Sequence, residues 1–451
     1  MLHFVSLASI LFLGYPIYGT LASIPSTILE DVNCNKSSIY YAPETVQDLE
    51  FIFEVATAYN FTMKQLISPE TVVKSSKSGL WNETNTNEVL VDTSNFNSFE
   101  YDKSSGYARV GAGLSLFNLT EKLHNLGRGL LCIPPQADVT VGAAILKGDH
   151  SSSLKYPTKF SHQIVGLVYL NKFGKLKNFT VTENSNFYEE HLLQTQFIGV
   201  IIELVIFTIP QFKITTRNDY KSESILWEDP KEFLNLVNTY DFFEFTWFPG
   251  SKEILVSTSE FTEINEPGNC KKHSSFDFTV EELVYIDEML KAMQNSVLDV
   301  GMLFAQLREL KSMYQLDHNG SKVLCSPAVG YSHKMMMTQK ENHAEIELPN
   351  RQEFRVTIPL NQFGNSLITM KEGLQGYPEA NYQTGINFKF FGDFNKFSNL
   401  ETPSVEISWK LIDLPIQAGN SLERKLGIEG NKAILNKLIY RHGGYQQEIQ
   451  C

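Results

Sequence analysis

Three segments decide the fold of this chain: Tyr107-Ala-Arg-Val-Gly-Ala-Gly-Leu114, Val139-Thr-Val-Gly-Ala-Ala-Ile-Leu-Lys-Gly-Asp-His150 and Phe197-Ile-Gly-Val-Ile-Ile-Glu-Leu-Val-Ile-Phe-Thr-Ile209. The first predicts a strand that ends in glycines and leads into an amphipathic helix up to Leu126. The second is rich in small residues, which allow backbone to approach a flat or anionic group. The third is a β-branched run, long enough for one bent buried strand or for a pair of strands.

The length and charge fit a globular protein of two or three domains. The chain has 451 residues, of which 42% are hydrophobic and 20% charged, and its net charge is −13. An acidic surface repels nucleic acid and anionic membranes, so we expect neither as a partner. Beyond the N-terminus, no run reaches the roughly 18 apolar residues that a membrane helix needs.

The N-terminal residues 1–22 predict a secretory signal peptide, because an apolar run is followed there by small residues. An uncleaved anchor is the alternative. A secreted glycoprotein is also favoured by Asn-x-Ser/Thr sequons, which begin at Asn35, Asn60, Asn82, Asn118, Asn178 and Asn319. The five cysteines leave at least one thiol outside intrachain bridges, and we expect one bridge between Cys270 and Cys325. No Cys-x-x-Cys pair is present, so we expect no metal site.

In their order, the three segments resemble the FAD-binding (PCMH-type) domain of the vanillyl-alcohol-oxidase-like flavoproteins, and within them the sugar-1,4-lactone oxidases. The counterparts of that family's motifs are Val110-Gly-Ala-Gly113, Val141-Gly-Ala-Ala-Ile145 with Gly148 and His150, Ile164-Val-Gly-Leu167 and Gly199-Val-Ile-Ile-Glu203. The aromatic run at 242–256 also resembles a lactone-oxidase signature, in which Phe-Trp-Phe-Pro precedes a charged turn and a valine strand.

The resemblance implies an α+β fold. A two-part FAD-binding domain is expected at residues 37–210, with parts at about 41–95 and 98–210. A substrate domain with a large antiparallel sheet flanked by helices is expected at residues 213–451. In the first part, an amphipathic run predicts a helix from Pro43 to Ala58, with the proline in its first turn.

The resemblance also assigns residues that bind FAD. The family's pyrophosphate loop corresponds to Lys74, Ser75, Ser76, Lys77 and Ser78. Lysines and a serine replace its two glycines and its flavin-linking histidine, which implies non-covalent FAD. The two lysines offer charge to phosphate, whereas a solvated loop that binds nothing is the alternative. The other expected cofactor residues are Gly142, Ala143, Gly148, His150, Gly199 and Val200. For His150 a structural role is the alternative.

Period-2 patterns predict strands at 354–358 and 386–390, and a third at 405–410 resembles the family's strand with a Glu-x-Arg pair over the flavin. Glu406 matches the glutamate, which handles substrate hydroxyls, and Ser408 occupies the arginine position. Lys410 shares the strand face of Ser408 and is the candidate to replace that arginine in part, so we expect Glu406 and Lys410 to be catalytic.

Two functions follow from these losses and retentions. The first is a secreted FAD-dependent oxidoreductase that transfers hydride from a sugar lactone or polyol to the flavin. The second is a catalytically inactive homologue that acts as a secreted binding protein. The family's charged residue near the flavin corresponds to Gln450, which cannot carry charge, and this favours the second; retention of Glu406 favours the first.

Overall fold

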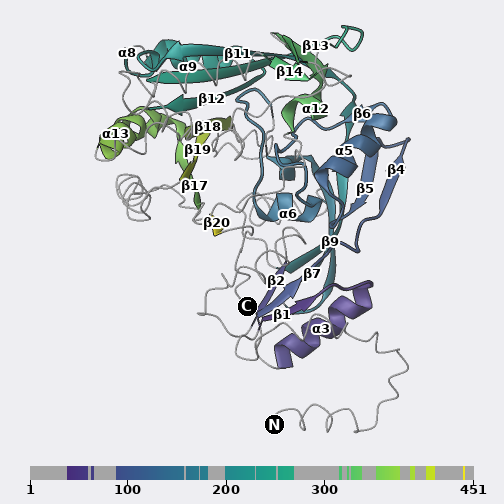
Figure 1. Cartoon of the computed structure of the whole chain (residues 1–451). Helices are drawn as coiled ribbons and strands as arrows, with labels where there is room; N and C mark the ends of the chain where they lie inside the picture. Colours follow the sequence, from purple (N-terminus) through teal and green to yellow (C-terminus); the bar gives the residue numbers. More distant parts are fainter. Residues whose placement is uncertain are drawn as a thin grey trace, which may run out of the picture.

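Three β-sheets organise the computed structural model (Figure 1). Its description covers residues 38–58, 62–65, 88–156, 159–171, 173–180, 199–228, 230–249, 252–268, 314–316, 322–324, 327–337, 352–375, 386–391, 403–411 and 440–441. The sheets have three, five and eight strands, and two short two-stranded pairs accompany them.

The first sheet is small and parallel, with strand order β1-β3-β2 and one helix beside it. Its elements are β1 (Ser38–Tyr41), α3 (Val46–Ala58), β2 (Thr62–Gln65) and β3 (Glu88–Val91). The hydroxyl of Thr45 accepts from the amide of Asp48 at 3.1 Å, and the Asp48 carboxylate accepts from the amide of Thr45 at 2.9 Å. This reciprocal cap starts the helix at Val46. The expectation that Pro43 lies in the first turn is therefore wrong.

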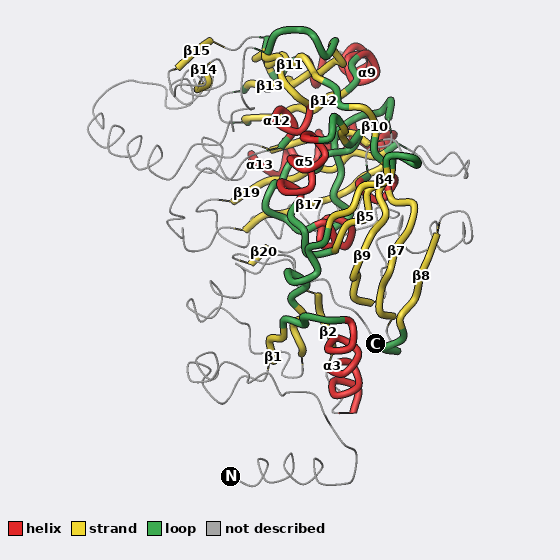
Figure 2. Tube along the Cα trace, turned by 90° about the vertical axis from the view of Figure 1, so that its right-hand side faces the viewer, coloured by secondary structure: helices red, strands yellow, loops and turns green. Residues whose placement is uncertain are grey.

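The second sheet has five antiparallel strands in the order β4-β5-β9-β7-β8 (Figure 2). The elements of this region are β4 (Phe99–Asp102), β5 (Tyr107–Gly111), α5 (Leu116–Asn125), β6 (Arg128–Gly129), α6 (Val141–Leu146), the 3-10 helix η1 (Phe160–Gln163), β7 (Ile164–Asn171), β8 (Leu176–Thr180), β9 (Gly199–Phe207) and β10 (Ile209–Pro210). Ser115 caps α5 by accepting from the amide of Asn118. The predicted strand and amphipathic helix are confirmed here.

Strand β9 contributes to two hydrophobic cores. Its register with β7 skips Ile202, which makes a bulge. Val200 and Ile202 pack with α3 and β3 of the first sheet, whereas Ile201 and Leu204 pack in the core that contains α5 and α6. The run is thus one bent buried strand, as the first of the two sequence readings predicts.

The third sheet is antiparallel, with strand order β16-β11-β13-β12-β18-β19-β17-β20. Its elements and helices are β11 (Lys213–Ser222), α8 (Ile225–Glu228), α9 (Pro230–Thr239), β12 (Phe242–Phe248), β13 (Glu253–Thr262), β16 (Ala328–Tyr331), α12 (Ser332–Met336), β17 (Gln352–Pro359), η3 (Leu360–Gln362), α13 (Phe363–Gln375), β18 (Ile386–Phe391), β19 (Ser404–Leu411) and β20 (Tyr440–Arg441). A separate hairpin joins β14 (Tyr314–Leu316) and β15 (Lys322–Leu324). The aromatic run at 242–256 forms β12 and β13, and the strands expected at 354–358, 386–390 and 405–410 are β17, β18 and β19.

The eight-stranded sheet has one aromatic face and one polar face. On the aromatic face Phe245 and Phe388 stack with their ring centroids 4.3 Å apart, and buried residues of α9 and α13 cover them. Because side chains alternate along a strand, Glu406 lies on the opposite, polar face, between the buried residues Val405 and Ile407. An α+β fold with a large antiparallel sheet flanked by helices is confirmed, while the domain boundaries at 210 and 213 stay a prediction.

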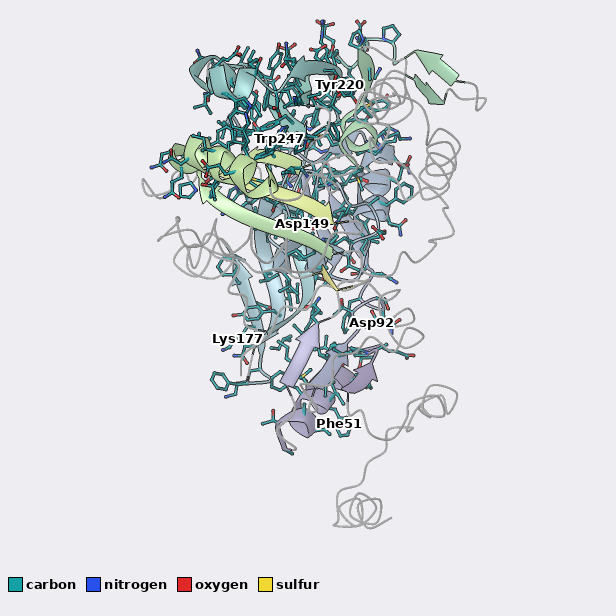
Figure 3. All side chains as sticks on the ribbon, turned by 60° about the vertical axis from the view of Figure 1, so that its left-hand side comes forward. Phe51, Asp92, Asp149, Lys177, Tyr220 and Trp247 are labelled. Carbon is teal, nitrogen blue, oxygen red and sulfur yellow. The ribbon has the colours of Figure 1, made fainter. Side chains whose placement is uncertain are left out.

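The polar face meets the N-terminal part of the chain at residues 147–153, and this turn, together with the side chains of the polar face beside it, is called the junction. In Figure 3, Asp149 marks the junction, between the regions of Trp247 and Asp92. The amide of Phe243 donates to the carbonyl of Ser152 at 3.1 Å, and the amide of Phe390 donates to its hydroxyl at 2.8 Å. Within the described ranges, no helix has the length and apolarity to cross a membrane.

Candidate active site

The junction begins where helix α6 ends. The amide of Gly148 donates to the carbonyl of Ile145, and the amide of Asp149 donates to that of Ala144, both at 2.9 Å. Gly148 has a φ of +63°, the left-handed conformation that such a helix end requires. This turn directs the next residue, His150, toward the large sheet. Gly148, which the sequence predicts to contact the cofactor, therefore ends helix α6.

His150 and Glu406 meet across the junction. The Nε2 atom of His150 lies 3.2 Å from Oε2 of Glu406, and the two side chains are 6% and 14% exposed. The other ring nitrogen, Nδ1, lies 2.8 Å from the carbonyl oxygen of Ser151. The two sequence candidates are thus brought together, although 256 positions separate them (406 − 150).

The two ring nitrogens of His150 face different groups. Nδ1 faces a carbonyl oxygen, which only accepts, so a proton on Nδ1 would be donated there. Nε2 faces the carboxylate of Glu406. Such a pair combines an acid and a base at one place, which is the equipment for moving a substrate proton.

A buried ion pair lies beside the histidine. The Nζ atom of Lys147 lies 3.2 Å from Oδ2 of Asp149, with side chains 1% and 6% exposed. Lys147 also donates to the side-chain oxygen of Gln136. Two buried charges persist only when each is compensated, so this pair fixes the turn that carries His150.

Cys132 packs against the same turn and is not in a disulfide. Burial raises the pKa of its thiol to about 12, and hydrogen bonding by Ser151 counteracts this only in part. The thiol is therefore protonated and unreactive at neutral pH. The predicted bridge between Cys270 and Cys325 lies outside the described residues.

Gly142 and Ala143 lie in the first turn of helix α6. The amide of Gly142 donates to the carbonyl of Ala112, and that of Ala143 to the capping hydroxyl of Thr140. A Cβ at Gly142 would meet Ala112 and the side chain of Gln65, each at 2.9 Å. Packing therefore requires a glycine here, and a contact with the cofactor stays a prediction.

Gly199 and Val200 begin strand β9. A Cβ at Gly199 would lie 2.0 Å from the carbonyl oxygen of Leu170, and the φ of this glycine is +155°. Val200 is fully buried in the core shared with the first sheet. Both residues are explained by the backbone and the core, and their proposed contact with the cofactor stays a prediction.

The remaining candidates from the sequence are the residues 74–78 and Lys410. Residues 74–78, the expected pyrophosphate loop, lie outside the described residues. Lys410 is on β19, opposite Glu353 of β17, and Ser408 is opposite Arg355. A cation is thus the register partner of the serine that replaces the family's arginine.

Sequence reasoning missed Lys147, Asp149 and Lys389, which also belong to the junction. The register pairs Lys389 of β18 with Glu406. The alternating pattern at 386–390 could have identified Lys389 as a polar-face residue, but its partner strand is not apparent from that pattern.

The donor set at the junction fits the redox end of FAD. A flavin enzyme of this kind needs a group that accepts the proton of the substrate hydroxyl, and it needs cations near the flavin. At the junction, Glu406 with His150 can accept the proton. Lys147 and Lys389 are the cations. No cluster of three or more metal-binding side chains occurs in the described part of the chain.

Comparison with known proteins bears on the cofactor and on the fold. Residues 37–180 match the family model described as FAD binding domain. L-gulonolactone oxidase of Scyliorhinus torazame is 25% identical over 233 residues, or 51% of this chain and 49% of that protein. D-arabinono-1,4-lactone oxidase of Yarrowia lipolytica is 25% identical over 236 residues, or 51% of this chain and 42% of that protein.

Among solved structures, cholesterol oxidase from B. sterolicum superposes with a TM-score of 0.63 at 11% identity, covering 91% of this chain and 82% of that one. At this identity the likeness shows the fold alone. The chain spans about half the length of the curated relatives that it matches. It has the fold of the PCMH-type FAD-binding flavoproteins, and the match at 37–180 supports FAD as its cofactor.

Proposed function

We propose that this chain, with an FAD-binding domain over residues 37–180, is an FAD-dependent oxidoreductase that oxidises a CH–OH group of a sugar lactone or polyol. The observation that carries the proposal is the contact between His150 and Glu406. It places a proton-accepting pair where the FAD-binding half meets the polar face of the large sheet. The names of the relatives, L-gulonolactone oxidase and D-arabinono-1,4-lactone oxidase, supply the substrate class.

The residues of the junction have separate roles in this proposal. FAD, when bound, supplies the group that accepts hydride from the substrate carbon. Glu406 takes the hydroxyl proton, and His150 keeps the carboxylate oriented. Lys147 and Asp149 hold the turn that carries the histidine. The loop 74–78 would hold the pyrophosphate.

Flavin content and its reduction test the proposal. Purified protein should be yellow, with an absorbance band at roughly 450 nm that bleaches when a sugar lactone or polyol is added without oxygen. The variant Glu406→Gln should keep its flavin and bleach at least ~100-fold more slowly. Glu372→Gln, on the exposed side of α13, is the matched control and should bleach at the normal rate.

Two results would contradict this function. A colourless protein that takes up no added FAD overturns it and restores the alternative of a non-catalytic binding protein. If Glu406→Gln bleaches as fast as the unaltered protein, the proton-accepting role of Glu406 is wrong even though the cofactor assignment stands.

We further propose that FAD is held without a covalent bond, because Lys77 replaces the histidine that links flavin in some relatives. Acid precipitation should then leave the flavin in the supernatant, and a yellow precipitate would contradict the proposal.

Secretion is proposed from the apolar N-terminus and from sequons whose asparagines, Asn118 and Asn178, are exposed. A mobility shift after enzymatic removal of N-glycans from the protein of its native source tests it, and unglycosylated protein retained in cells would contradict it.

A further inference from the structure

A row of charged residues crosses three neighbouring strands on the polar face. The register pairs Glu244 of β12 with Lys389 of β18, and Lys389 with Glu406 of β19. Directly opposed residues of an antiparallel pair point to the same face, with Cβ atoms about 5 Å apart. Lys389 therefore stands between two carboxylates.

Two observations indicate that Lys389 lies on the side of the sheet that faces the junction. Phe388 and Phe390, the neighbours of Lys389 along β18, are both 0% exposed in the aromatic core on the other face. The positive charge of Lys389 also acts on the thiol of Cys132, which belongs to the FAD-binding half. Lys389 thus lies on the polar face, opposite Glu406 in the register and within electrostatic range of Cys132.

The row itself holds two carboxylates, those of Glu244 and Glu406, and one cation between them, that of Lys389. The nearby ion pair of Lys147 with Asp149 compensates its own charges. A carboxylate on the substrate would add an uncompensated negative charge, whereas hydroxyl groups would not.

We propose that Lys389 binds the substrate by donating a hydrogen bond to an oxygen of a neutral polyhydroxylated molecule, and that Glu244 disfavours molecules that carry a carboxylate. The inference rests on the proposed function and narrows it. It selects lactones and polyols over open-chain sugar acids. No covalent step is added, because Lys389 only orients the hydroxyl that Glu406 deprotonates.

The first test removes the charge of Lys389. Binding of a sugar lactone is measured on the flavin-containing protein through the change in the flavin spectrum, together with kcat and KM for flavin reduction. Referred to the flavin that the variant contains, Lys389→Met should bind the lactone about 10- to 100-fold more weakly, because a charged donor is lost. Lys389→Arg should recover most of the affinity. Lys177→Met, exposed on β8, is the control and should not change it.

The second test changes Glu244 without changing its volume. The variant Glu244→Gln leaves Lys389 with one carboxylate neighbour, so an open-chain aldonate should bind at least ~10-fold more tightly than to the unaltered protein. Lactone binding should change by less than about 3-fold. This variant is informative even where Lys389→Met does not fold.

The outcomes separate the two proposals. If the unaltered protein is yellow and is reduced by a lactone, the proposed function stands; equal lactone binding by Lys389→Met, or unchanged aldonate binding by Glu244→Gln, then overturns this inference alone. If the unaltered protein prefers an aldonate to the lactone, the inference is overturned and the oxidoreductase activity remains. If neither compound is bound or reduced, both proposals fail.

Discussion

The hydroxyl of Ser152 should be worth several times more stability than an ordinary surface hydroxyl. It accepts from the amide of Phe390 at 2.8 Å and donates to the carbonyl of Phe243. Ser152 is 7% exposed, so water does not replace these bonds. Its side chain thus closes the gap where strands β12 and β18 stop pairing with each other.

Replacing Ser152 by alanine leaves a buried donor and a buried acceptor without their partner. Each such group costs about 1–3 kcal/mol, so we expect the free energy of unfolding to fall by about 2–6 kcal/mol. Urea unfolding followed by tryptophan fluorescence measures this, since Trp247 is buried in the same sheet. Hydrogen exchange at the amide of Phe390 should also accelerate.

The control is Ser104→Ala, whose hydroxyl donates to Asp102 at 2.7 Å in an exposed turn. Its effect should stay within about 0.5 kcal/mol. If Ser152→Ala and Ser104→Ala cost the same, with no faster exchange at Phe390, the hydroxyl does not hold the sheet to the FAD-binding half and the reasoning is refuted.

Three other perturbations follow from buried groups. His333, in α12, is buried; this burial, and secondly the charge of neighbouring His124, lowers its pKa from 6.5 to about 4. Because the unfolded chain takes up the proton at a higher pH than the folded chain, the free energy of unfolding should fall by up to about 3 kcal/mol as the pH drops from 6.5 to 4. His333→Gln should flatten that dependence, as urea titrations at both pH values would show. Cys132 should resist iodoacetamide at pH 8 in the folded protein and react in urea, as peptide mass mapping would show; rapid labelling of folded protein contradicts its burial. Gly199→Ala should lower the unfolding midpoint sharply or prevent soluble expression, because its Cβ would meet the carbonyl of Leu170; an unchanged midpoint would show that β9 can shift.

The sequence predicts the elements of this fold well because their patterns are local. The run at 197–209 predicts a bent strand or a pair of strands, and the alternation at 386–390 predicts another strand. The proline at 43 predicts a helix that starts too early, because Thr45 and Asp48 form the cap and the helix begins at Val46.

The site was predicted only residue by residue. His150 and Glu406 each follow from the family resemblance, but their contact does not, since no local pattern relates positions so far apart. Lys389 and Glu244 were missed for the same reason: each looks like an ordinary polar residue of an alternating strand until register places it beside Glu406. Lys147 was missed because lysine is rarely buried, and only the contact with Asp149 explains it.

The skipped residue in β9 has a consequence for how the FAD-binding half can be handled. One strand fills two cores, with Val200 on one side and Leu204 on the other. Gln65 adds a second tie, since its side-chain oxygen accepts from the amide of Ile201 at 2.9 Å. A fragment cut near residue 95 would expose apolar surface on both pieces. The two parts should therefore melt together and be inherited together, and a swap of either part between relatives would succeed only if this strand travelled with it.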